Sequence, residues 1–247
     1  MRPGDDLSAE ALEAVIPGRP LQTHPVVLST AVTAAAWAEA DAPDGAVVVA
    51  GHQISPRGHA DRPWKLTPGG GLGLSVVLRP QLPPQREAWL YIVATLALAD
   101  VCAEGSLIRW PDEVRRGDVM TAAVGMQVHL GPAKIKWAVV NLWLPEVEPP
   151  RGPVLAALLE AIDARQAGDP GGLLEDYARR SATIGRRISA RLLGGTGPRM
   201  QGTAIGANEE GCLVIETDAG ARAPLRPQDV RGVEEVETPP AGDKLTP

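Results

Sequence analysis

A basic, glycine-bearing loop between two apolar runs constrains this chain more than any other stretch. The run at 46–50, AVVVA, is typical of a buried strand, and a second apolar run follows at 72–78. The cationic and aromatic side chains between the two runs are those of Arg57, His59, Arg62, Trp64 and Lys65. Backbone amides approach a ligand closely at glycine, and guanidinium groups pair with carboxylate or phosphate oxygens. The pattern predicts a loop that binds an anion, and a solvated surface loop is the alternative.

The residues of this loop resemble the biotin-binding loop of the biotin–protein ligases. That family's pattern runs roughly Q-x-x-G-R-G-R-x-G-R-x-W and then S-P-x-G-x-L-x-L-S. The residues in register here are Gln53, Arg57, Gly58, Arg62 and Trp64, followed by Pro68, Gly70, Leu72, Leu74 and Ser75. Further matches in the family's order are Ser29-Thr30, the RWPDE run at 109–113, the strand at 134–141 and the segment 201–230. One such match is weak evidence, but a collinear series across residues 22–235 is hard to produce by chance.

The resemblance implies an α+β fold: a mixed, mostly antiparallel sheet flanked by helices, as in the biotin and lipoate ligases, plus a small C-terminal SH3-like β-barrel. We expect an N-terminal extension at 1–21, a ligase-like catalytic domain at 22–187, the barrel at 188–236 and a disordered tail at 237–247. Periodicity and turn residues predict helices over 7–15, 31–39, 87–103, 154–167 and 173–181. They predict strands over 26–28, 46–50, 72–78, 107–110, 119–130, 135–144, 188–193, 202–207, 213–217 and 221–224.

The activity that the resemblance implies is ATP-dependent ligation. Biotin or a related carboxylic acid would be activated with ATP and Mg²⁺ to an acyl-adenylate and passed to a lysine of a carrier domain. This chemistry brings two anions together, so it needs cations near both. Arg57 matches the family arginine that closes over the acyl-adenylate. The implied ligand-binding residues are Ser29, Thr30, Gln53, Arg57, Gly58, Arg62, Trp64, Trp110, Trp137 and Asn141.

Two acidic residues after the Trp-Pro pair are the predicted metal ligands. Asp112 stands where the family has an asparagine that helps to hold the triphosphate and its Mg²⁺, and Glu113 matches the second acid. A hard cation accepts carboxylate oxygens directly, so both side chains suit Mg²⁺. The alternative is that Trp110 belongs to the core and the two acids cap a turn.

Two departures from the family pattern concern catalysis. The family lysine that follows Trp-Pro is absent from the run at 117–123, and losing one such contact costs about 3 kcal/mol or more of transition-state energy. Lys65 is the predicted stand-in. Trp137 and Val139 replace two pocket glycines, so Trp137 is expected to occupy the place of the biotin bicycle. The sequence therefore leaves two alternatives: an active ligase, or an impaired or inactive homologue that serves as a ligand-binding or scaffold protein.

Charge, cysteine content and apolar runs indicate which classes of partner and which cellular compartment to expect. A formal net charge of −6 and a pI near 5.3 argue against a nucleic-acid partner. Cys102 and Cys212 form no metal or redox motif, which suits a reducing cytoplasm. The acidic N-terminus has no signal-peptide pattern, and no apolar run reaches the roughly 20 residues that span a bilayer. We expect a cytoplasmic protein, and the resemblance implies a homodimer joined through sheet edges.

Overall fold

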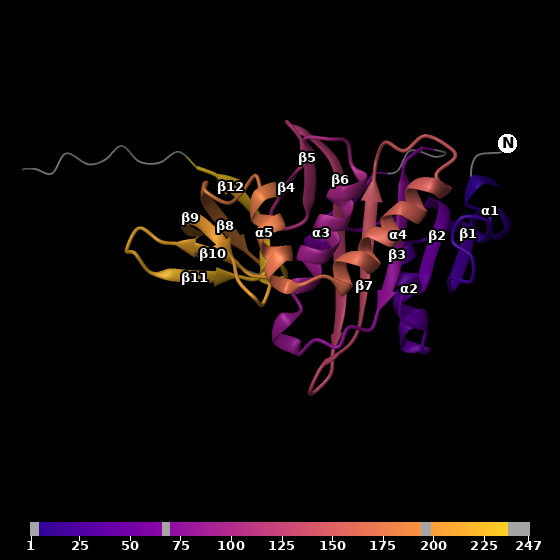
Figure 1. Cartoon of the computed structure of the whole chain (residues 1–247), viewed down its shortest axis with the longest axis horizontal. Coiled ribbons are helices and arrows are strands. Elements are labelled where there is room, and N and C mark those ends of the chain that lie inside the picture. The colour runs from indigo at the N-terminus through magenta and orange to yellow at the C-terminus, as the bar shows by residue number, and fades with distance from the viewer. Residues whose placement is uncertain (1–4, 66–69, 194–198, 237–247) are drawn as a thin grey trace, which may run out of the picture.

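The computed structural model describes residues 5–65, 70–193 and 199–236, which form a seven-stranded and a five-stranded sheet (Figure 1). The larger sheet has the strand order β1-β2-β3-β7-β6-β5-β4. Its strands are β1 (Leu21–Val27), β2 (Val47–Gln53), β3 (Leu72–Leu78), β4 (Leu107–Arg109), β5 (Glu113–Arg116), β6 (Val119–Leu130) and β7 (Ile135–Leu144). Only β1 and β2 pair in parallel, and the other described pairs are antiparallel. The mixed, mostly antiparallel sheet predicted from the sequence is confirmed.

Helices cover both faces of this sheet. The larger core joins the sheet to α3 (Trp89–Val101), α4 (Gly152–Ala167) and α5 (Pro170–Arg180). A smaller core lies on the opposite face under α2 (Thr30–Glu39), which places Ala34 and Ala38 against the strands. These two positions are four residues apart, so they lie on one side of the helix. The cavity described below also lies beside α2, at its N-terminal end.

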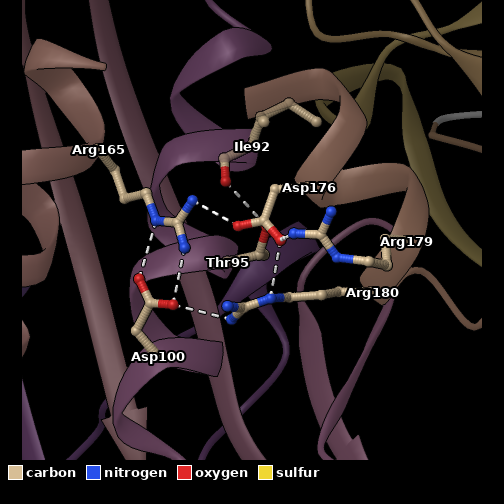
Figure 2. Close-up of polar contacts among 7 residues, drawn as sticks. All are labelled: Ile92, Thr95, Asp100, Arg165, Asp176, Arg179 and Arg180. Atoms are coloured by element: carbon tan, nitrogen blue, oxygen red, sulfur yellow. Dashed lines mark hydrogen bonds and ion pairs between the residues drawn. The ribbon is translucent and has the colours of Figure 1, made fainter. Parts of the chain in front are cut away.

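An ion-pair network holds the three helices of the larger core together (Figure 2). Arg165 from α4 pairs with Asp100 of α3 at 2.7 Å and with Asp176 of α5 at 2.6 Å. Arg180 bridges the same two carboxylates, at 2.8 Å and 3.0 Å, and Arg179 adds a contact to Asp176 at 2.5 Å. Because Asp176 is buried, three guanidinium groups offset the cost of removing its charge from water.

The five-stranded sheet has the order β11-β10-β9-β8-β12 and lies at the β4 end of the larger sheet (Figure 1). Its strands are β8 (Arg187–Leu192), β9 (Met200–Ala207), β10 (Leu213–Glu216), β11 (Arg222–Leu225) and β12 (Val230–Glu235), with the short helix η4 (Pro227–Asp229) before β12. This arrangement is consistent with the expected SH3-like domain. The predicted tail at 237–247 lies outside the described residues.

The N-terminal segment packs on the opposite end of the molecule (Figure 1). It contains η1 (Asp5–Leu7) and α1 (Ala9–Glu13), and it buries Leu7 and Leu12 in the larger core. Its strongest attachment is a buried ion pair, in which the Arg151 guanidinium contacts Asp6 at 2.7 Å and 2.9 Å. The described part of this predicted extension is therefore an integral layer of the fold. No helix in the described ranges is both long and apolar enough to cross a membrane.

Candidate active site

A cavity of about 530 Å³ lies where the N-terminus of α2 faces the basic loop at 54–65. The loop contributes Arg57, Gly58 and His59 to the wall, and Ser29 and Asn141 come from the α2 cap and from β7. The C-terminal part of the chain adds Leu193 and Gln228. The cavity therefore has polar groups on several sides and one guanidinium group, that of Arg57.

Predicted site residues meet in a buried hydrogen-bond network beneath this cavity. The Gln53 carbonyl oxygen accepts from the Thr30 amide at 2.8 Å and from the Thr30 hydroxyl at 3.1 Å. The Ser75 hydroxyl lies 2.8 Å from that of Thr30 and 2.9 Å from the Asn141 amide oxygen. Ser29 caps α2 by accepting from the Ala31 amide, which satisfies a free donor of the first turn. Of this group, Ser29 and Asn141 reach the cavity wall.

The basic loop folds on itself and packs tightly on β6. The Gly58 amide donates to the Arg62 carbonyl at 2.8 Å, and the Trp64 amide donates to the Pro56 carbonyl at 3.0 Å, which closes the loop. A Cβ at Gly125 of β6 would lie 2.9 Å from the Gly58 Cα, so this approach needs glycine at 125. A Cβ at Gly58 would overlap the Trp64 ring, so glycine is needed there for a different reason. The Trp64 ring stacks on Trp143 with centroids 5.5 Å apart, and Trp64 is not part of the cavity wall. Its predicted ligand-binding role remains a prediction.

The two predicted catalytic cations lie in different places. Arg57 is on the cavity rim with 47% of its side chain exposed, and its Nε is 3.9 Å from the Asp61 carboxylate. This long, exposed contact leaves the guanidinium able to turn toward a ligand. Lys65 is exposed and does not line the cavity. The expectation that Lys65 replaces the family lysine therefore receives no support from its position.

The predicted metal ligands are engaged by Arg62. One guanidinium nitrogen of Arg62 lies 3.5 Å from Asp112, and the other lies 3.5 Å from Glu113. Burial raises the pKa of Asp112 to about 7, although the charge of Arg62 opposes that shift. Among the described residues, no group of three or more His, Cys, Asp or Glu side chains could hold a metal. Trp110 is buried in the core, as the alternative interpretation held, and the metal-binding role of the two acids is not tested.

Trp137 does not occupy the cavity, so this part of the sequence prediction was wrong. It shares one face of β7 with Val139 and Asn141, as strand alternation requires. At Trp137 and Val139, however, α2 covers that face, and their side chains complete the smaller core with Ala34 and Ala38. Four residues of strand place Trp137 about 13 Å from Asn141, where the face opens to the cavity.

Several residues of the site were not identified from the sequence. His59 is buried between Tyr91 and the backbone of Val230, and burial lowers its pKa to about 4, so the ring is neutral at physiological pH. Ser75 was matched to the family pattern but was not assigned to the site, and a lone glycine inside a predicted strand is the signal that could have identified Gly125 as a place of close approach. No local sequence signal marks the cavity residues Tyr91, Leu193 and Gln228.

Comparison with known proteins agrees with this architecture. No protein-family model matches the chain. The bifunctional ligase/repressor BirA of Bacillus subtilis is 25% identical over 244 residues, which cover 85% of this chain and 74% of BirA. A biotin protein ligase from Aquifex aeolicus, solved in complex with biotin and ATP, has the same fold: its TM-score is 0.65 at 19% identity, over 87% of this chain and 99% of that one.

A mycobacterial enzyme shows a higher percentage identity. The biotin–[acetyl-CoA-carboxylase] ligase of Mycobacterium tuberculosis is 30% identical over 205 residues, which cover 72% of this chain and 75% of that enzyme. The chain belongs to the biotin–protein ligase family.

Proposed function

We propose that this protein is an ATP-dependent biotin–protein ligase, which acts on biotin or a closely related carboxylic acid. The observation that carries the proposal is the open cavity beside α2, with Arg57 on its rim and Asn141 in its wall. The impaired or inactive homologue is the alternative for two reasons: the family lysine is absent from the run at 117–123, and Trp137 was expected to fill this space. Trp137 lies under α2 instead, so the second reason is removed, and the exchange assay below tests the first.

The reaction needs two displacements at the same place. A carboxylate oxygen of biotin attacks the α-phosphorus of ATP, and the bond to pyrophosphate breaks. The amine of a carrier lysine then attacks the acyl carbon, loses a proton and displaces AMP. Negative charge gathers on the carboxylate and the α-phosphate in the first step, so a nearby cation stabilises its transition state. Arg57 is the arginine in the cavity wall, and we assign it this role.

Mg²⁺ would enter with the phosphates of ATP. Proteins usually hold such an ion through one or two carboxylates together with the substrate phosphates. Asp112 and Glu113 are adjacent and fit that requirement once they are deprotonated, which is the form a metal binds. Arg62 lies 3.5 Å from each carboxylate, and Arg115 contacts Glu113 at 2.9 Å, so these residues can hold the ion only after both arginines release them.

The carrier domain has a suitable place to dock beside the cavity mouth. Exposed apolar side chains gather there from the end of β1, the first turn of α2 and the end of β2, namely Val26, Leu28, Val32 and Ile54. Leu28 and Val32 also belong to the cavity wall, so a lysine carried by a partner on this patch would reach the acyl group. Homodimer pairing through the β1 edge would compete with this docking, and Pro25, which has no amide donor, weakens strand pairing there. We place the reaction in the cytoplasm, consistent with two free cysteines.

The test is biotin-dependent exchange of labelled pyrophosphate into ATP, followed by transfer to a carrier domain. We expect wild-type exchange, and Arg57→Ala should reduce its kcat about 100- to 1,000-fold, as for loss of one transition-state contact. Arg199→Ala is the matched control, because this exposed arginine pairs with Glu234 in the C-terminal sheet. Equal rates for Arg57→Ala and wild type would refute the role of Arg57. Tight binding of a biotinyl-adenylate analogue without any exchange would favour the inactive homologue.

A further inference from the structure

His59 connects the cavity loop to two other parts of the molecule. Its side chain is 3% exposed, its Nε2 lies 2.7 Å from the Val230 carbonyl oxygen, and its Nδ1 lies 3.0 Å from the Tyr91 hydroxyl. A carbonyl oxygen only accepts, so Nε2 carries the proton and donates it to Val230. Nδ1 then accepts from Tyr91, whose pKa is raised by burial, so that its hydroxyl keeps its proton. Both ring nitrogens of the neutral imidazole are satisfied.

A second contact joins the loop to the same strand. Arg62 donates to the carbonyl oxygen of Arg231 at 2.9 Å, one residue after the position that His59 contacts. The loop is therefore attached at two points to the start of β12, in the C-terminal sheet. Because each attachment uses a backbone carbonyl of β12, side-chain changes in that strand leave the acceptors in place.

The loop needs such an anchor because its turn is strained. Ala60 and Asp61, directly after His59, have φ of 51° and 59°. Residues with a Cβ rarely occupy this left-handed region, and they persist there only when the surroundings hold them. Asp61 also supplies the contacts of Arg57: its carbonyl oxygen is 3.3 Å from a guanidinium nitrogen. The strained turn thus carries the residue that Arg57 contacts on the cavity rim.

We propose that His59 is a positioning residue, which fixes the turn at Ala60 and Asp61 against the C-terminal sheet and so places Arg57 at the cavity. The role in catalysis rests on the proposed ligase function. The clamp itself uses only groups of the protein. Its consequence is that the C-terminal sheet is part of the active site, because it holds the loop that presents Arg57.

The first arm of the test needs no activity. Hydrogen exchange of the ligand-free protein reports on the Gly58 and Trp64 amides, which close the loop. We expect His59→Ala to accelerate exchange at these amides about tenfold or more, because a buried anchor is lost, while the amides of α4 stay unchanged. His129→Ala is the matched control, since this histidine is exposed and bonds Glu39 far from the loop. Unchanged exchange in His59→Ala would overturn the proposal.

The second arm measures ligation by the same variants. In His59→Ala the closed loop should become a minor state. The KM for biotin should then rise about tenfold while kcat changes less, because the apparent affinity falls with the fraction of molecules whose loop is closed. His59→Gln keeps a donor near Nε2 and should recover both the exchange protection and most of the KM. Tyr91→Phe removes only the second partner and gives an independent test if His59→Ala fails to fold. A His59→Gln variant as impaired as His59→Ala would contradict the assigned contact to Val230. Absence of ligation by the wild type would refute the proposed function and leave the exchange result standing.

Discussion

Neutralising Asp6 should destabilise the protein strongly, although Asp6 lies far from the cavity. Its carboxylate accepts from the Arg151 amide at 2.8 Å and from two guanidinium nitrogens at 2.9 Å and 2.7 Å. The side chains of the pair are 4% and 2% exposed. Asp6→Asn keeps the shape but leaves a buried guanidinium charge without its counterion, and Gly71 offers only a carbonyl at 3.2 Å.

The magnitude follows from the desolvation of an unpaired charge. Breaking a buried pair by removing one partner costs about 3–5 kcal/mol. For a chain of this length, that is a fall in Tm of roughly 6–20 °C. Replacing both partners together, as in Asp6→Leu with Arg151→Met, should recover most of the loss, because no buried charge remains. Urea denaturation of Asp6→Leu, of Arg151→Met and of the double variant measures the coupling free energy between the two side chains directly.

The pH dependence supplies a second, independent readout. The hydrogen bond from Arg151 lowers the pKa of Asp6 below its usual 3.8, despite opposing desolvation. The stabilisation is therefore complete above the unfolded pKa and is lost as pH falls through the lower folded value. Asp6→Asn should abolish this acid-dependent part. Glu234→Gln, which removes two exposed pairs, is the control and should change stability by less than about 0.5 kcal/mol. A loss under about 1 kcal/mol in Asp6→Asn would refute the reasoning.

Two further substitutions test other parts of the fold. Asp176→Asn removes the shared carboxylate of the helix network and should lower the free energy of unfolding by about 1–3 kcal/mol, measured by thermal unfolding. Asp218→Asn removes an exposed carboxylate and should lower it little. Equal effects of the two substitutions would contradict a network role. Gly125→Ala brings a Cβ to within 2.9 Å of the Gly58 backbone and should cost about 1–3 kcal/mol in urea denaturation, with weaker ligand binding. Gly206→Ala, where a Cβ meets open space, is its control, and similar losses in both would argue against close packing of the loop.

Three largely apolar strands were predicted to the residue. The ranges 72–78, 119–130 and 135–144 coincide with β3, β6 and β7, because each is bounded by turn residues. The strands β5 and β12 were not predicted. Their sequences, EVRR and VRGVEE, carry charges, and partner strands rather than local propensity hold them in place. β1 was predicted too short, since Pro25 and polar neighbours are typical of a linker as well as of an edge strand.

In the candidate site too, residues that match a local sequence pattern were identified, whereas contacts between distant parts of the chain were not. Thr30, Gln53 and Asn141 were identified through the family resemblance, and the fold brings them together. Alternation along β7 puts Trp137 on the face of Asn141, but it contains no information on which part of that face a helix covers. The role of His59 depends on a contact with Val230, which no local pattern reveals.

The distance along the chain between His59 and its acceptor also matters while the protein is being made. Val230 lies 171 residues downstream of His59. At a synthesis rate of about 5–20 residues per second, the ribosome needs roughly 10–30 s to reach it. During that interval the strands β2 and β3 can emerge, but the loop between them lacks its two attachments to β12. Ligand binding with full affinity is therefore a late event in biogenesis, and a nascent or truncated chain that lacks β12 should bind biotin more weakly than the whole chain.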